Sequence, residues 1–382
     1  MERKKFFKKI KRVVIKIGSS SLTLKDGGLD LSNMEKFSFE ISGLVKQHIE
    51  VIVVTSGAIA AGLKYLNISS RPKDIAALQA AASVGQVELM RTYSDLFARH
   101  DLKIGQILLT REDTARRMQY LNIKNTIEDL LKLKVIPIIN ENDSSAVEEI
   151  KFGDNDRLAA LVASLTEADL LIILSDIEGL YDRDPQEDKD AKLISFVERI
   201  TPGVEKLAGG IGSMYGSGGM ISKIKAAKVC SFSGIAMVIA HSKTPGVLEK
   251  IVSFEKIGTF FAPQTSHKVK SVKRWIAFGT GTKGKIVIDR GAEDAVANKG
   301  KSILPVGIIK VEGKFSKGDT LKVFSVDDKL IAKGISNFSD DEISRLMGKN
   351  EKQILAELGS TLCGEVIHRD SLVVFNEKDL KS

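Results

Sequence analysis

Short apolar segments alternate with segments of helical periodicity along the first 240 residues of the chain. The segments that we expect to form strands are residues 12–17, 50–55, 104–109, 135–139, 169–174 and 236–240. The expected helices are residues 31–49, 76–97, 122–133, 158–165 and 223–232. Strands that alternate with helices form a mainly parallel sheet covered on both faces. The pattern therefore predicts an α/β fold, a three-layer αβα sandwich with a mainly parallel sheet.

Polar clusters that contain glycine, serine, asparagine or acidic residues follow four of the expected strands. They are residues 18–21, 56–58, 140–143 and 175–176. Ligands of open α/β sheets bind at the carboxyl ends of the strands. Four such clusters at one edge therefore predict a ligand site there.

Three short polar residues, Asp154, Asn155 and Asp156, follow Gly153 and precede the expected helix over residues 158–165. Asp and Asn are favoured at a helix start because they accept hydrogen bonds from the unpaired first-turn amides. Simple capping needs only one such residue. Two carboxylates beside an amide can also hold an ammonium group, orient lysines or bind a metal, so we expect a functional site here.

Lys16 lies inside an apolar strand, two residues before Gly18. A lysine at such a position is costly unless its ammonium group emerges at the strand end or meets an anion. The alternative is a lysine that extends along the apolar surface to reach water.

A glycine-rich stretch over residues 209–220 precedes Lys223 and a helix. Backbone amides near a helix start can bind phosphates, and Lys223 could reach a phosphoryl oxygen. The spacing matches neither a Walker A loop nor a dinucleotide fingerprint. Taken alone, the stretch is equally consistent with a flexible loop and with a nucleotide site.

The two lysines, the glycine-rich loops and the acidic cluster suit phosphoryl transfer without a protein nucleophile. No Ser/His/Asp arrangement is evident, and the five histidines show no metal-ligand spacing. A hydrolase or a zinc enzyme is therefore not favoured.

The net charge of +8 is concentrated at the two ends of the chain. Residues 1–12 hold seven basic groups and one acidic group, and residues 259–382 hold 21 basic and 16 acidic groups. The acidic balance between them argues against a large nucleic-acid surface on the main body. We expect the basic start of the chain to be a solvated charge run.

The two cysteines, Cys230 and Cys363, show neither metal-ligand nor redox spacing. This pattern fits a reducing compartment. No segment has the apolar length of a signal peptide core or a membrane span. We therefore expect a cytoplasmic protein with no membrane contact.

Short β-rich segments appear from about residue 259. They are residues 285–289, 302–304, 307–311, 320–324 and 330–335, with one helix expected over residues 340–347. These segments predict a small β-rich second domain. We expect a first domain over residues 1–262, a linker over residues 263–274, the second domain over residues 275–365 and a tail over residues 366–382.

Five segments of the first domain resemble, in the same order, the motifs of the amino acid kinase family. They are residues 13–19, 54–62, 137–143, 152–156, and 216–220 with Lys223. Within that family the combination is similar to the bacterial enzymes that phosphorylate the side-chain carboxylate of L-glutamate. The second domain resembles a PUA domain through residues 274–276, 284–291, 302–307 and 313–319.

The resemblance implies ATP-dependent formation of L-glutamyl 5-phosphate, the first step of proline biosynthesis. It implies that Lys16 and Lys223 stabilise the transferring phosphoryl group and that Asp156 holds both lysines. The implied glutamate-binding residues are Ser56, Gly57, Asp143, Asn155 and Asp154. The implied ATP-binding residues are Lys16, Gly18, Ser175, Asp176, Ser217, Gly218, Gly219, Met220, Ile221, Ser222 and Lys223. Position 175 is serine where the family commonly has threonine, which keeps the hydroxyl group, and positions 217 and 221 also differ from the commonest form.

The resemblance further implies Mg²⁺ that bridges the ATP phosphates without a dedicated set of protein ligands. It also implies feedback inhibition by proline and assembly as a homodimer or homotetramer. Two other readings stay open at this point. One is a sister kinase that acts on aspartate, N-acetylglutamate, carbamate or UMP, and the other is a protein that chiefly binds RNA through the PUA domain.

Overall fold

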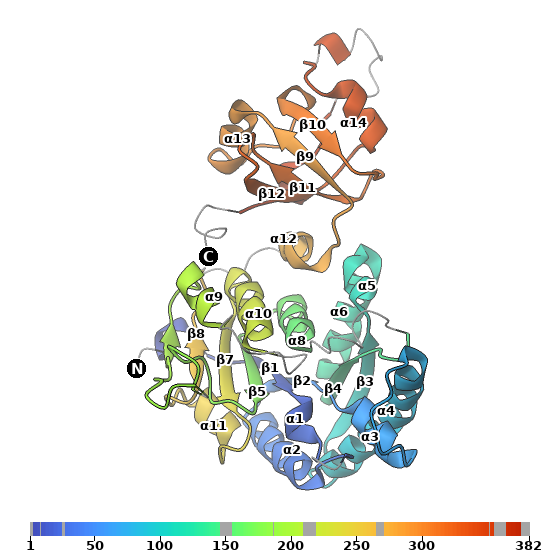
Figure 1. Ribbon diagram of the computed structural model, residues 1–382, viewed down its shortest axis with the longest axis vertical. Helices are drawn as coiled ribbons and strands as arrows, with labels where there is room; N and C mark the ends of the chain where they lie inside the picture. Colours follow the sequence, from blue (N-terminus) through green and yellow to red (C-terminus); the bar gives the residue numbers. More distant parts are fainter. Residues whose placement is uncertain are drawn as a thin grey trace. The chain divides into compact units, whose positions relative to one another are not determined.

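The computed structural model describes residues 3–7, 9–24, 27–145, 155–185, 187–208, 219–264, 271–350, 352–354 and 364–375 (Figure 1). The chain divides into two compact units, Met1–Val269 and Lys270–Ser382. Each unit has its own sheet and its own hydrophobic core.

The first unit contains an eight-stranded sheet with the strand order β3-β4-β2-β1-β5-β7-β8-β6. Its strands are β1 (Arg12–Ile17), β2 (Glu50–Val54), β3 (Lys103–Leu109), β4 (Val135–Glu141), β5 (Leu170–Ser175), β6 (Phe196–Val197), β7 (Ala236–His241) and β8 (Thr259–Phe261). All neighbouring strands pair in parallel except β7 and β8. The prediction of a mainly parallel sheet is confirmed.

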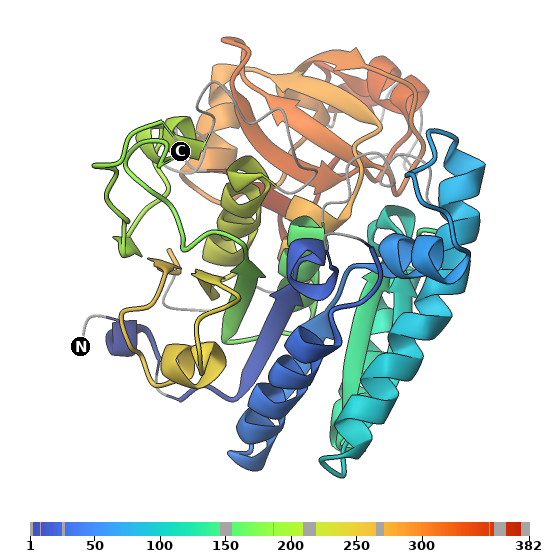
Figure 2. The same ribbon diagram turned by 60° about the horizontal axis from the view of Figure 1, so that its bottom comes forward.

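Helices lie on both faces of this sheet (Figure 2). One face carries α2 (Leu31–Lys46), α4 (Ile75–Ala98) and α11 (Val247–Val252), and the other carries α6 (Arg117–Lys132), α8 (Asn155–Leu165) and α10 (Met220–Phe232). The shorter helices are α1 (Ser19–Leu22), α3 (Ala58–Tyr65), α5 (Arg111–Ala115) and α9 (Pro202–Ala208). The layers are those of an αβα sandwich.

The central strands are buried because helices cover both of their faces. In β5 every residue is buried, and in β1 every residue after the first is buried. Side chains of β1 such as Val13 and Ile15 pack with Met34 and Phe37 of α2 in the main core. A strand buried on both faces has a continuous apolar sequence. This is why these strands could be predicted from their sequence.

We expected residues 1–12 to form a solvated charge run, and this prediction is wrong for Arg3, Phe6 and Phe7. Arg3, in a 3₁₀ turn (η1, Arg3–Phe6), is only 5% exposed. Its guanidinium group donates to four main-chain carbonyls, those of Ser195, Glu255, Ile257 and Gly258, at 2.7–3.0 Å. Phe6 and Phe7 pack against the core. The two aromatic residues in the run anchor it, while Lys4 and Lys5 stay exposed.

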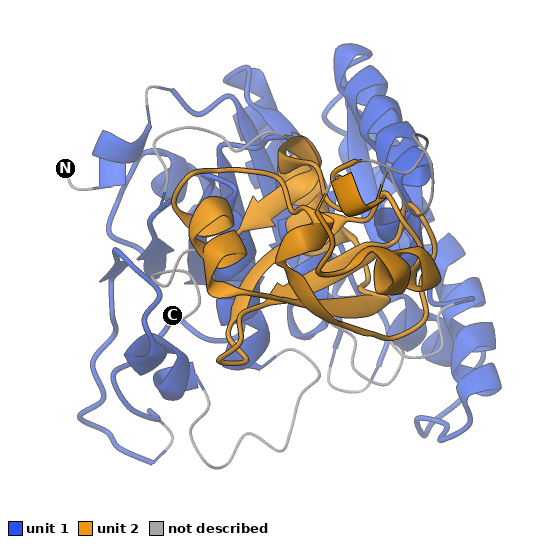
Figure 3. Ribbon diagram, turned by 90° about the horizontal axis from the view of Figure 1, so that it is seen from above, with its two compact units in different colours: residues 1–269 blue, residues 270–382 orange. Residues whose placement is uncertain are grey.

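The second unit, drawn in orange in Figure 3, contains a five-stranded sheet with the order β10-β9-β11-β12-β13. Its strands are β9 (Gly284–Ile288), β10 (Ile308–Glu312), β11 (Thr320–Phe324), β12 (Leu330–Ile335) and β13 (Leu372–Val374). Its helices are α12 (Ser271–Arg274), α13 (Arg290–Ala297) and α14 (Asp340–Leu346), with a π-helical turn η2 (Trp275–Gly279) and 3₁₀ turns η3 (Pro305–Gly307) and η4 (Arg369–Ser371). The prediction of a β-rich second domain is confirmed.

Three details of the second unit differ from the expectation. The expected strand over residues 302–304 is reduced to one bridge between Ile303 and Ile367. Helix α13 was not expected, because its sequence is mostly polar and Val296 is its one buried residue. Residues 366–382, expected as a tail, include β13, which pairs with β12. A three-residue strand is too short to show a periodic pattern.

Among the described residues, no helix combines the length and the apolar character needed to cross a membrane.

Candidate active site

Four neighbouring strands of the first unit, β4, β2, β1 and β5, carry the polar clusters at their carboxyl ends. The clusters lie on one edge of the sheet because these four strands run parallel. The prediction that they share an edge is confirmed. Helices α8 and α10 pack together on one face of the sheet, α8 against these four strands and α10 against the neighbouring β7 (Figure 1).

A buried ion triad joins β1, α8 and α10. Asp156 of α8 has no solvent exposure, and its Oδ1 lies 2.7 Å from Nζ of Lys16. Its Oδ2 lies 3.2 Å from Nζ of Lys223 and accepts a hydrogen bond from the hydroxyl of Ser222 at 2.7 Å. Both lysines are less than a tenth exposed. One carboxylate therefore fixes two ammonium groups, and the triad carries a net positive charge.

The carboxylate of Asp156 is ionised despite its burial. Burial raises the pKa of Asp156, but the charges of Lys16 and Lys223 and the hydrogen bond from Ser222 together lower this pKa below the ordinary value of 3.8. A buried ion is stable only when partners compensate its lost hydration. Here two cations and a hydroxyl supply that compensation.

A chain of amide side chains lies next to the triad. Asn155, which precedes Asp156 at the start of α8, donates through Nδ2 to the carbonyl of Thr55 at 2.6 Å, to Ser56 Oγ at 2.9 Å and to Asn140 Oδ1 at 3.0 Å. Asn140, at the end of β4, donates to Gln86 Oε1 of α4 at 2.9 Å. The structure thus brings α8, β4 and α4 together around the loop that follows β2.

Asn140 and Gln86 were not among the predicted site residues. Asn140 had a signal, because it opens the polar cluster over residues 140–143. Gln86 had none, because it lies within an alanine-rich helix. Only the packing of α4 against α3 brings it near the strand ends.

Gly57 permits the turn that presents Ser56. It has φ +100°, in the left-handed region, and it precedes the first residue of α3. A Cβ there would also lie 3.3 Å from Cγ2 of Thr23. A residue with a side chain would be strained at this position.

The predicted ATP-binding residues that the structure describes flank the triad. Gly18 follows Lys16 and donates to the carbonyl of Leu174 at 3.4 Å, which places it at the end of β5. Ser175 is the last residue of β5 and Asp176 follows it, and the serine hydroxyl donates to Oδ1 of Asp176 at 3.0 Å. Four predicted residues, Gly219, Met220, Ile221 and Ser222, lie at the start of α10 before Lys223.

Some predicted residues lie outside the described part of the chain. They are Asp154, Ser217 and Gly218. Asp143 is described and lies, half-buried, just beyond the end of β4. The polar triplet was expected to open a helix, and this is confirmed for Asn155 and Asp156.

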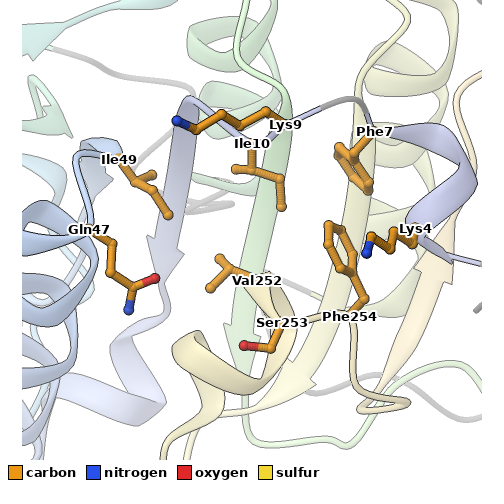
Figure 4. Close-up of a pocket in the computed structure, with 9 residues that line it drawn as sticks. All are labelled: Lys4, Phe7, Lys9, Ile10, Gln47, Ile49, Val252, Ser253 and Phe254. Carbon is orange, nitrogen blue, oxygen red and sulfur yellow. The ribbon is translucent and has the colours of Figure 1, made fainter.

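A hollow of about 270 Å³ lies at the other edge of the sheet (Figure 4). Ile10 and Ile49, which line it, precede the first residues of β1 and β2. Lys4, Phe7, Lys9, Gln47, Val252, Ser253 and Phe254 complete its lining. It is therefore separate from the triad, which lies at the carboxyl ends of the strands.

Comparisons with known proteins cover both units. A model of the amino acid kinase family matches residues 11–241, and a model of the PUA domain matches residues 284–358. The glutamate 5-kinase of Syntrophotalea carbinolica is 47% identical over 372 residues, which are 97% of this chain and 99% of that protein. The glutamate 5-kinase of Caldanaerobacter subterraneus is 48% identical over 363 residues, 95% of this chain and 97% of that protein.

The solved structure of UMP kinase from Bacillus anthracis aligns with 69% of this chain and all of its own, at 15% identity and a TM-score of 0.45.

Proposed function

Because this chain belongs to the glutamate 5-kinases of the amino acid kinase family, we propose that its first unit transfers the γ-phosphoryl group of ATP to the side-chain carboxylate of L-glutamate. The observation that carries the proposal is the triad in which Asp156 holds Lys16 and Lys223. Such an arrangement offers fixed positive charge to two anionic reactants.

In the proposed reaction a side-chain carboxylate oxygen of glutamate attacks the γ-phosphorus, and the bond from that phosphorus to the bridging oxygen of ADP breaks. The products are L-glutamyl 5-phosphate and ADP. Negative charge gathers on the transferring group and the leaving oxygen, so preorganised cations lower the barrier. Lys16 and Lys223 supply these cations, and Asp156 and Ser222 keep the ammonium groups in place.

Glutamate recognition falls to the loop after β2 and to the start of α8. Ser56 and Asn155 are already hydrogen-bonded to each other, and the turn at Gly57 directly follows Ser56. The amino group of glutamate needs oxygen acceptors, which Asn155, Asp143 and Asp154 offer. We therefore assign these five residues to the substrate.

We assign ATP to the side of the triad opposite the proposed glutamate-binding residues. Gly18, Ser175 and Asp176 gather where β1 and β5 end, and Gly219 to Lys223 form the start of α10. Main-chain amides at the start of this helix suit phosphate oxygens. The position of Lys223 in the first turns of α10 supports its assignment to the γ-phosphoryl group.

We propose that Mg²⁺ enters this site as a complex with ATP. Within the described ranges, no group of three or more Asp, Glu, His or Cys side chains is gathered to hold a metal. Both oxygens of Asp156 are engaged by ammonium groups. When bound, Mg²⁺ would neutralise phosphate charge, while the protein's own residues orient the two substrates.

The place of the product in proline biosynthesis supports the proposal that proline inhibits the enzyme. We also propose, from the resemblance to the family alone, that the chain assembles as a homodimer or homotetramer. Inhibition would appear as a rise in the glutamate concentration for half-maximal rate when proline is added. Light scattering would give the assembly mass, and a monomer at assay concentrations would contradict the second proposal.

The test of the activity is trapping of acyl phosphate with hydroxylamine. L-glutamate, L-aspartate and N-acetyl-L-glutamate are compared with ATP at equal concentrations. Hydroxamate from glutamate alone is the expected result. Hydroxamate only from another acceptor would keep the phosphoryl transfer and overturn the assignments of Ser56, Asp143 and Asn155.

RNA binding by the second unit is a second candidate function. The match to the PUA domain and the basic balance of residues 259–382 favour it. Weak phosphate contacts are screened at physiological salt. A gel shift with a structured RNA under that condition is the test, and no shift at micromolar protein would remove this candidate.

A further inference from the structure

The amides of Asn155, Asn140 and Gln86 form a relay whose direction is set by one main-chain carbonyl. The carbonyl of Thr55 can only accept, so Asn155 must turn Nδ2 toward it. The same Nδ2 contacts Asn140, which must therefore offer Oδ1 there and turn its own Nδ2 toward Gln86. Gln86 must in turn accept with Oε1. The orientation of all three amides thus follows from the fold.

At each end of this chain of amides, one polar atom lacks a hydrogen-bond partner among the described residues. Oδ1 of Asn155 and Nε2 of Gln86 are buried, and neither has a hydrogen-bond partner in the part of the chain that the structure describes. A buried acceptor without a partner destabilises a folded protein unless a ligand completes it. Oδ1 of Asn155 is thus left free to accept a hydrogen bond from a bound substrate.

Direct backbone contact between α3 and α4 holds Gln86 in place. A Cβ on Gly85 would lie 1.8 Å from the carbonyl oxygen of Ala58, and a Cβ on Gly62 would lie 1.8 Å from that of Ala81. The two helices therefore touch without intervening side chains. Ala58 directly follows the loop that carries Ser56 and Gly57. Gln86, next to Gly85, is fixed relative to that loop.

We propose that Gln86 is a positioning residue for the α-amino group of the substrate. Its Oε1 holds Asn140, and Asn140 holds the Asn155 amide with Oδ1 free to accept a hydrogen bond from the ammonium group of glutamate. The inference rests on the proposed function. Without the acceptor at position 86, the Asn140 amide can turn over. Its NH₂ group would then face the NH₂ group of Asn155 and displace it.

Two substitutions separate this role from direct substrate contact. Gln86→Met removes the acceptor at similar length, whereas Gln86→Glu keeps an acceptor for Asn140 and removes the donor Nε2. For Gln86→Met we expect the KM for glutamate to rise about 10-fold, the effect of one lost hydrogen bond, with kcat within about threefold of the wild type. For Gln86→Glu we expect a KM within about threefold of the wild type. A direct contact between Nε2 and a substrate carboxylate would reverse this order and overturn the proposal.

Glutarate, which is glutamate without its amino group, supplies a readout that structural damage would not mimic. Its inhibition constant as a competitor of glutamate should be nearly the same for the wild type and for Gln86→Met. Two changes that remove the same interaction are not additive. An inhibition constant that rises as much as the KM for glutamate would overturn the proposal.

Gln106→Met is the matched control, because this glutamine of β3 is exposed. This variant should keep the KM and kcat for glutamate and the inhibition constant for glutarate within about twofold of the wild-type values. A wild-type protein that forms no hydroxamate from glutamate would overturn the proposed function and this inference with it. An active wild type with an unchanged KM in Gln86→Met would overturn the inference alone.

Discussion

The ammonium groups of Lys16 and Lys223 are bound by two different oxygens of one carboxylate. Oδ1 of Asp156 takes the first lysine and Oδ2 takes the second. The two lysines come from a strand and a helix that are far apart in the sequence, and neither element alone could hold them at a fixed separation. The buried carboxylate sets that separation before any substrate arrives, and this is the property that the proposed phosphoryl transfer requires.

Replacement of either lysine should reduce turnover. Lys16→Ala or Lys223→Ala removes one preorganised cation, and we expect the rate of hydroxamate formation to fall by at least about 10²-fold. Lys228→Ala is the control on the same helix, because this lysine pairs with Glu205 near the surface. A near-normal rate for a folded lysine variant would remove that lysine from the mechanism.

Asp156→Asn should change how stability depends on pH. The pKa of Asp156 is lower in the folded protein than its ordinary value of 3.8. Its ion pairs therefore stabilise the fold fully at pH values above 3.8, and this stabilisation is lost as pH falls through the lower folded-state pKa. The Asp156→Asn variant carries no titratable carboxyl group at this position. The free energy of unfolding in urea should therefore differ between wild type and variant at neutral pH, and this difference should narrow as pH falls below 3.8. A difference of constant size would contradict the ionised state of Asp156.

Gly85→Ala should destabilise the first unit, whereas Gly43→Ala should stabilise it. The new methyl group at position 85 would overlap the carbonyl of Ala58, and overpacking of this kind costs about 1–3 kcal/mol. Position 43, in α2, has open space around a Cβ, and alanine in a helix interior is favoured over glycine by about 0.5–1 kcal/mol. Urea unfolding of both variants measures the difference. Equal changes in the free energy of unfolding for the two variants would mean that α3 and α4 separate easily.

Arg3→Ala should lower the free energy of unfolding by about 2 kcal/mol, because it removes charge-assisted hydrogen bonds to four carbonyls. Lys4→Ala, one residue further and exposed, should change stability by less than about 0.5 kcal/mol. Thermal and urea unfolding of the two variants provide the comparison. Similar stability for both would mean that the first turn is not part of the fold.

The central strands and the edge that carries the site could be predicted because burial on both faces imposes continuous apolar sequence. Helices α1 and α3 were missed, since they begin inside segments that were interpreted as polar loops after β1 and β2. A four-residue helix such as α1 is too short to show periodicity.

The candidate site was less accessible to sequence reasoning. Lys16, Asp156 and Lys223 were selected because charged residues stand out in apolar or glycine-rich surroundings. The role of Gln86 depends on helix α4 touching the start of α3, and two glycines permit that contact. A glycine in an alanine-rich helix does not reveal which backbone it faces, so this part of the site required the structure.

The anchoring of Arg3 also bears on how the chain folds while it is being synthesised. The carbonyl of Glu255 is synthesised 252 residues after Arg3. At about 5–20 residues per second, the interval is roughly 13–50 s. During this time Arg3 lacks its acceptors at Glu255, Ile257 and Gly258, and Phe6 and Phe7 lack their contact with Phe260. Completion of the first unit is therefore linked to the synthesis of β8, and a nascent chain that stops short of it would leave the basic and aromatic segment Arg3–Phe7 without these contacts.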